Sequence, residues 1–252
     1  MNSATVRNLL VRGMLAGLGA GVLALIVAYF LGEPYVDSAI GLEEAHAHSH
    51  EHEVELVSRS LQSTAGLATG ILIYGVAFGG IAALAYCFAL GRVGRFGPRA
   101  TALLLSGTAL LAVYVVPFLK YPANPPAVGD PDTIGERTTL YFLMMVLSVL
   151  LAVAAVIAGK RLAPKLGTWY ATVVAVLGFA VVTGLAYAFL PTVNEVPGDF
   201  PATLLWRFRL SALAMQAVLW GGFGLLFGEL AERLLRPKPA TVPAGTAVAA
   251  PQ

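Results

Sequence analysis

The charged residues of this chain are confined to short segments, and long apolar runs without any charge separate these segments. Hydrophobic residues make up 58% of the sequence and charged residues only 12%, against roughly 25% charged in a soluble domain. One soluble core of this size could not bury so much apolar surface, whereas a lipid bilayer accepts apolar side chains and excludes charge. The pattern therefore predicts a protein that crosses a membrane several times.

Six apolar runs can each supply the roughly 20 residues that a spanning helix needs. The runs are unbroken rather than alternating, which favours helices over the strands of a membrane barrel. We expect an all-α, polytopic membrane helix bundle that forms a single transmembrane domain over 1–236, followed by a disordered, Pro/Ala-rich tail over 237–252. The predicted spans are 8–31, 65–90, 100–119, 138–159, 167–190 and 210–230.

The basic residues predict the orientation of the bundle. Eleven of the 16 Lys and Arg residues lie in the N-terminal segment, in the loops at 92–99 and 160–165, and in the C-terminal segment. Twelve of the 14 acidic residues lie in the other three loops. Cytoplasmic loops carry the excess of Lys and Arg, so both termini are expected in the cytoplasm of a bacterial inner membrane.

The spans carry small residues at four-residue spacing, which lets helix backbones approach closely in lipid. Ordinary tight helix packing is the interpretation that we adopt, and a dedicated dimer face is the alternative. The glycine sets are Gly13/Gly17/Gly21, Gly66/Gly70, Gly75/Gly79 and Gly224/Gly228.

An internal repeat is visible at one end of the spans. Phe-Leu pairs close the first, third and fifth spans, and each pair is followed by a proline, an acidic loop and then an arginine. The arginines are Arg59, Arg137, and Arg207 or Arg209. The pattern predicts three helix hairpins of the same orientation, a parallel-repeat arrangement found in transporters.

The cores of the predicted spans contain no Asp, Glu, Lys or Arg. Ion-coupled carriers usually keep such groups at mid-membrane, so their absence argues against a self-contained pump. There is no phosphate-binding loop of the GxxxxGK[S/T] type and no constellation of catalytic acid, base and nucleophile. We expect neither enzymatic activity, nor a tightly bound cofactor, nor nucleic-acid binding.

All four histidines of the protein fall within one short segment after the first span. They alternate with other residues as His46, His48, His50 and His52, and the carboxylates Glu51 and Glu53 lie among them. Neutral imidazole suits divalent cobalt, nickel, copper and zinc, and carboxylates raise the local concentration of cations. The segment predicts flexible capture of a metal ion. The alternative is a solvated acidic loop.

Two further loops carry oxygen ligands. A proline-rich loop after the third span holds Asn124, Asp130 and Asp132, and the loop after the fifth span holds Asn194 and Asp199. Prolines stiffen such a loop, which could then present these oxygens at a pore mouth. We expect Arg137 and Arg207 to pair with the aspartates and to fix the loops. A purely structural cap over the helix ends is the alternative.

Three stretches resemble one known family. They read GLEEAHAHSHEHE after the first span, FLKYPANPPAVGDPDTIGERTTLY in the proline-rich loop, and FLPTVNEVPGDFPATLLWRFRLSAL before the last span. Over roughly 7–236 the chain is similar to the CbtA family of probable cobalt transporter subunits. The resemblance implies cobalt uptake tied to cobalamin synthesis, and a small single-span, histidine-bearing partner, CbtB. The family is described with about five spans, where six are counted here.

These observations together predict an inner-membrane subunit of an uptake transporter for a divalent metal. Co²⁺ is the expected ion, and Ni²⁺ and Zn²⁺ are the alternatives. The histidine segment would gather the ion, and the two oxygen-bearing loops would form the mouth. The alternative function is a non-transporting membrane protein that binds metal or assists assembly and serves a partner permease.

The charge distribution makes a testable prediction of topology. In a Cys87→Ala background, single cysteines at Ser49, Ala127 and Val196 should react with an impermeant thiol reagent from outside the cell. Cysteines at Gly94, Pro164 and Pro243 should react only after the membrane is opened. Labelling of position 94 or 164 in intact cells would reject the predicted orientation.

Overall fold

The computed structural model describes residues 2–46, 58–126, 128–129 and 131–236, and within these ranges it contains helices and no strand. The predicted all-α membrane helix bundle is confirmed. The predicted tail at 237–252 lies outside the described residues. In chain order the elements are α1 (Ser3–Val27), η1 (Ala28–Gly32), α2 (Glu33–His46), α3 (Arg59–Leu61), η2 (Gln62–Gly66), α4 (Leu67–Ala89), α5 (Pro98–Ala109), η3 (Leu110–Val115), α6 (Val116–Lys120), η4 (Pro131–Thr133), α7 (Ile134–Phe189) and α8 (Ala202–Leu235).

Local sequence explains several helix ends. Asn2 caps α1, because its side-chain oxygen accepts a hydrogen bond from the Thr5 backbone N–H at 2.9 Å. Pro98 opens α5 from the first turn, where a missing N–H costs nothing. Beyond the end of α4, Gly91 adopts a φ of +74°, a left-handed conformation that glycine takes without strain.

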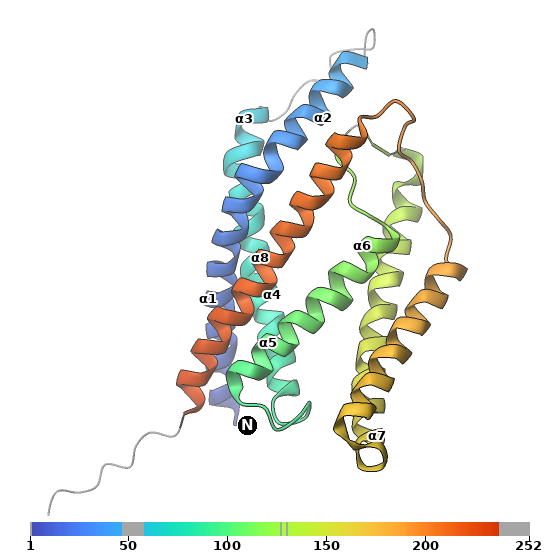
Figure 1. The fold of residues 1–252 in the computed structure, drawn as a ribbon. Helices are drawn as coiled ribbons and strands as arrows, with labels where there is room; N and C mark the ends of the chain where they lie inside the picture. Colours follow the sequence, from blue (N-terminus) through green and yellow to red (C-terminus); the bar gives the residue numbers. More distant parts are fainter. Residues whose placement is uncertain (1, 47–57, 127, 130, 237–252) are drawn as a thin grey trace, which may run out of the picture.

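Five helical stretches in the described chain are long and apolar enough to cross a membrane, namely 3–45, 59–89, 98–120, 134–189 and 202–235. The fourth, α7, contains both predicted spans 138–159 and 167–190. It breaks at Gly167, whose φ of 76° and ψ of 158° are not helical. Gly159 lies against Ala171 and Ala175, so the two limbs of α7 fold back on each other (Figure 1).

The first helical stretch is longer than predicted. It was expected to end near Leu31, but it continues through η1 and α2 to His46. The segment η1 is a π-helix, and Pro34 follows it closely. The π-helix η3 likewise precedes Pro117. Proline removes a backbone N–H and crowds the preceding turn, so a wider turn lets the helix continue past it.

The closest helix contact joins α1 and α4 through glycine. Gly17 lies against the backbone of Gly75 and Gly79, and Gly13 lies against the backbone of Gly79 and the Cβ of Ala83. Side chains larger than hydrogen would hold these helices apart, so packing of this kind needs small residues. The Gly224/Gly228 pair packs against α5, whereas no group lies within 4 Å of a Cβ built at Gly70. The packing interpretation of the glycine pattern therefore fits every set except Gly66/Gly70.

The helices form two packed groups. Phe78, Tyr86, Trp220, Phe223 and Phe227 are the aromatic side chains of a core shared by α1, α4, α5 and α8. A smaller core around Met144 joins α7 to η3 and α6. Figure 1 shows α1, α4 and α8 together on one side, α7 on the other, and the α5–α6 stretch crossing between them. The second half of that stretch, η3 and α6, is therefore the main link to α7.

The basic segments gather at one end of the bundle. The N-terminus, the connection from α4 to α5, the bend of α7 and the end of α8 all lie at the lower end in Figure 1. The acidic connections lie at the opposite end, which we call the outer end because the charge pattern predicts that it faces outward. The start of α1 and the end of α8 thus lie at the same end of the bundle.

The α1–α4 contact predicts a stability difference between two identical substitutions. A Cβ at Gly17 would overlap the carbonyl of Gly75, so Gly17→Ala forces the helices apart. We expect the free energy of unfolding to fall by about 1–3 kcal/mol. Gly70→Ala, with nothing within 4 Å, is the control and should be neutral or slightly stabilising. Thermal unfolding in detergent measures both, and equal behaviour of the two variants would contradict the close contact.

Candidate functional site

A cavity of about 580 Å³ lies at the outer end, where α6, α7 and α8 meet the loops at 121–130 and 190–201. Its polar lining comes from three regions of sequence that are far apart. The polar residues that line it include Lys120, Asn124, Arg137, Asn194, Glu195 and Arg209. Aromatic rings of Tyr114, Phe118, Tyr121 and Tyr141 complete much of the wall.

The loop after α6 folds inward rather than standing in solvent. Pro125 is fully buried, and Val128 is nearly so. Tyr121, the first residue of the loop, is also buried, and its hydroxyl donates to the Pro191 carbonyl at 2.9 Å. Burial raises the pKa of the Tyr121 phenol, which keeps the proton that this hydrogen bond uses. The loop therefore closes over the outer end of the bundle, as the cap alternative expects, and also lines the cavity.

Arg137, at the start of α7, forms an ion pair with Glu195 of the 190–201 loop. The Thr133 hydroxyl donates to the other oxygen of the same carboxylate. Gly129 packs on this pair with a φ of +126°, and a Cβ there would lie 2.5 Å from Arg137 Nη1. The Arg137–Glu195 ion pair thus joins the start of α7 to the loop at 190–201, and Gly129 of the preceding loop packs on it.

Arg209, near the start of α8, makes the corresponding contact to the other loop. Its Nε donates to the Ala123 carbonyl at 3.2 Å, and its Nη2 donates to Asn124 Oδ1 at 2.9 Å. Arg209, from the hairpin of the fifth and sixth predicted spans, therefore holds the loop that joins the third and fourth spans. Arg137, from the hairpin of the third and fourth spans, holds the loop that joins the fifth and sixth. The two outer hairpins are fastened to each other rather than each to itself.

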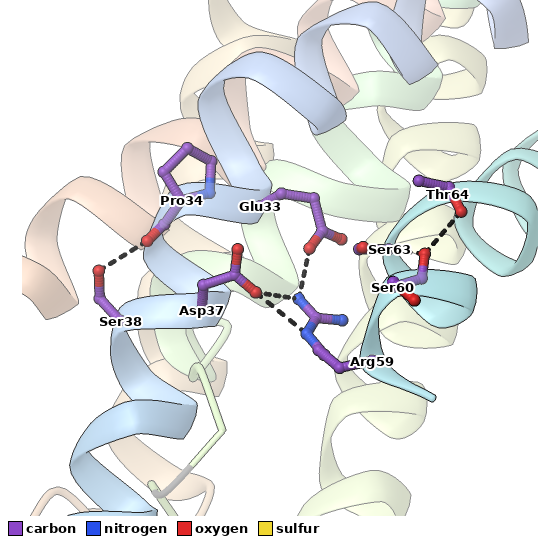
Figure 2. Close-up of polar contacts among 8 residues, drawn as sticks. All are labelled: Glu33, Pro34, Asp37, Ser38, Arg59, Ser60, Ser63 and Thr64. Carbon is purple, nitrogen blue, oxygen red and sulfur yellow. Dashed lines mark hydrogen bonds and ion pairs between the residues drawn. The ribbon is translucent and has the colours of Figure 1, made fainter. Parts of the chain in front are cut away.

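The first hairpin closes differently. Arg59, at the start of α3, donates from Nε and Nη2 to Asp37 Oδ1 at 3.0 and 2.8 Å, and pairs with Glu33 as well. Figure 2 shows the guanidinium between these two carboxylates of α2. Glu33 and Asp37 lie one helical turn apart on one face of the helix. These contacts fix the start of α2, the helix that ends at His46.

The predicted metal-capture residues lie at the edge of what the structure describes. His46 is the last residue of α2, while His48, His50, Glu51, His52 and Glu53 fall at 47–57, outside the described residues. Within the described ranges, no group of three or more His, Cys, Asp or Glu side chains is placed to hold a metal ion.

The predicted mouth residues divide between two locations. Asn124 and Asn194 both line the cavity. Asp132 and Asp199 are exposed and do not line it, and Asp130 lies outside the described residues.

The structure describes only part of the predicted arginine pairing, because Asp130 lies outside the described residues. Among the described residues no ion pair joins Arg207 to Asp199, and Arg137 contacts Glu195. Arg209 and Glu195 line the cavity and were not among the predicted site residues. Glu195 follows Asn194 directly, and Arg209 was one of the two arginines noted before the last span.

The architecture is that of a multi-pass α-helical membrane protein with a polar-lined cavity at one end. The family of probable cobalt transporter subunits, CbtA, matches residues 6–232, nearly the whole chain. The chain belongs to this family, as the sequence motifs indicated. A search of curated proteins and a search of solved structures each found no match.

The Arg137–Glu195 pair predicts a measurable coupling. The two side chains are 30% and 10% exposed, so their charges are only partly screened by water. Arg137→Gln and Glu195→Gln should each lower the free energy of unfolding, and the double variant should lose less than the sum, with a coupling of about 1–3 kcal/mol. Glu136→Gln, on an exposed neighbour, is the control. Simple additivity of the two losses would show that the pair does not join the loops.

Proposed function

We propose that this protein is the membrane subunit of a bacterial uptake transporter for Co²⁺, with both termini in the cytoplasm. The observation that carries the proposal is the extent of the family match, which covers 6–232 and so includes all five long helical stretches. A match of that extent cannot come from one shared loop. It supports a role in transport for the bundle as a whole, and it is consistent with a protein that is not an enzyme.

The outer histidine segment is proposed to gather the ion. The helical stretch 3–45 has 43 residues, about 65 Å at ~1.5 Å per residue, whereas a hydrocarbon core is about 30 Å thick. The N-terminal basic residues belong at the cytoplasmic surface, so α2 would extend well beyond the outer surface and carry His46 with it. The Arg59 contacts with Glu33 and Asp37 support such a projecting helix (Figure 2).

The chemistry of the segment suits the proposed ion. Histidine nitrogen is a good ligand for Co²⁺, Ni²⁺ and Zn²⁺, and Glu51 and Glu53 add negative charge around it. Residues on a loop can raise the local concentration of an ion without forming a rigid site. We therefore propose that the segment delivers the ion to the outer end of the bundle, where Asn124, Asn194 and the aspartates at 130, 132 and 199 are the proposed mouth.

A small single-span subunit of the CbtB type is the proposed partner. The most apolar part of α7 is 11% buried within the described chain, against 33% for each of the other four stretches. Gly178 and Gly184 of α7 have open space where a Cβ would project. Small residues on an uncovered helix favour close approach of another helix, so we place the partner on α7.

A second candidate function is a non-transporting membrane protein that binds metal or assists assembly of a partner permease. The observation that favours it is the lack of any Asp, Glu, Lys or Arg in the cores of the predicted spans. Charged groups at mid-membrane mark ion paths in many carriers. Cobalt uptake by reconstituted vesicles, with and without the small partner, separates the two: uptake supports the transporter, and its absence in both preparations supports the alternative.

Replacing His46, His48, His50 and His52 with alanine should weaken uptake at low cobalt concentration and spare it at saturating concentration. The reason is that the segment concentrates the ion but lies away from the spans. Imidazole binds metal in its neutral form, so the difference between the wild type and the variant should shrink as the pH falls below about 6.5. Uptake of ⁵⁷Co²⁺ over a concentration series measures this. Loss of uptake at every concentration would instead place the histidines on the path itself.

A further inference from the structure

The outer cavity carries more positive charge than its own carboxylate neutralises. Lys120, Arg137 and Arg209 line it, and Glu195 is the one carboxylate in its described lining. Both oxygens of Glu195 are already engaged, one by Arg137 and the other by Thr133. Lys120 and Arg209 therefore lack a carboxylate partner among the residues that the structure describes.

Neutral oxygen atoms hold these two cations in place. Lys120 Nζ donates to the Tyr187 carbonyl at 2.9 Å, and Arg209 donates to Ala123 O and Asn124 Oδ1. Carbonyl oxygens orient a cation but do not cancel its charge. An ammonium has three donors and a guanidinium has five, so both groups keep donors for a further partner. Both side chains are partly buried, where charge without a counter-charge is unfavourable.

The rest of the wall suits a small polar ligand. Thr138, Thr192 and Asn194 add uncharged hydrogen-bonding groups, and Tyr114 and Tyr141 add aromatic surface. The volume of about 580 Å³ lies in the usual range for small-molecule sites, roughly 300–1,000 Å³. With the cavity empty, the two unbalanced positive charges would repel a divalent cation at Asn124 and Asn194. An anion would be attracted by both charges, and once bound it would remove that repulsion.

We propose that this cavity binds an oxyanion, a carboxylate or phosphate group, through Lys120 and Arg209. The planar guanidinium fork matches the paired oxygens of such a group, and the ammonium supplies a second point charge. A free solute and the phosphate of a lipid headgroup offer the same chemistry. Lys120 belongs to α6 and Arg209 to α8, so the bound anion would bridge the two packed groups of helices.

Purified full-length protein tests the proposal by two measurements. Thermal unfolding is followed while inorganic phosphate or citrate is added, with sodium chloride at equal ionic strength as the reference. Phospholipid phosphorus retained after extensive detergent washing is measured in parallel. Stabilisation by phosphate or citrate identifies a free oxyanion as the ligand. Retained phospholipid that is lost in the variants below identifies a headgroup.

Lys120→Gln and Arg209→Gln should each weaken binding roughly 10- to 100-fold, the usual effect of losing one charge-assisted hydrogen bond. Arg207→Gln is the matched control, because Arg207 is exposed, lies two residues from Arg209 and does not line the cavity. Arg209→Lys keeps the charge without the fork and should weaken binding less than Arg209→Gln.

Arg209 also holds the 121–130 loop, so its loss could unfold the outer end. Lys120→Gln removes a single hydrogen bond to a carbonyl, so this variant should stay folded and can test anion binding even if the Arg209 variants unfold. The proposal is overturned if neither oxyanion nor lipid binds, or if Lys120→Gln binds as the wild type does. Cobalt binding to the histidine segment, measured on the same variants, should be unchanged, so failure of the anion site can be told apart from failure of the proposed metal capture.

Discussion

A bilayer interior hydrates neither charge nor free backbone, and this constraint decides where the charged groups of the protein can lie. The ion pairs among the described residues lie at the ends of the helices. Arg59 and Arg137 meet carboxylates at the outer end, and Arg99 meets Glu229 at the other end. Between these ends the helices pack through glycine and alanine against backbone and through the aromatic cluster around Phe223, with a few hydrogen bonds from hydroxyl groups to backbone carbonyls.

The helices of the bundle do not all pack equally tightly against one another. The glycine contact brings α1 and α4 close, and α8 packs on both α1 and α5. Packing of α7 is concentrated on η3 and α6, helped by the Ser148 hydroxyl, which donates to the Ala112 carbonyl, and by Tyr187, which donates to Val116. The outer cavity lies along this contact between the two groups. A change in how α7 sits against α6 would alter the cavity, because both elements line it.

The arrangement of the outer loops shows how far sequence reasoning reached. The similarity of the two loops was visible, and the structure brings Asn124 and Asn194 to one cavity. Which arginine faces which loop was not visible. Residues 207 and 209 are two positions apart on a helix, so they point about 200° apart, and only the rotation of α8 decides which one meets the loop. Glu195 was passed over for Asp199 because spacing in an irregular loop does not indicate which carboxylate turns inward.

The sequence by itself determined the helical class, the apolar segments, the gathering of basic residues at one end, and most of the glycine contacts. These properties depend on which segments are apolar enough to enter the bilayer and which carry charge that the bilayer excludes. Composition and residue spacing show both directly. The tertiary structure alone decided that the first helix runs on to His46 and that the outer hairpins are fastened crosswise by Arg137 and Arg209. It also decided that Lys120 and Arg209 meet in one cavity where the described residues offer them no carboxylate of their own. Such contacts join residues about 60 to 90 positions apart, and they depend on the tilt and rotation of whole helices, which no local pattern specifies.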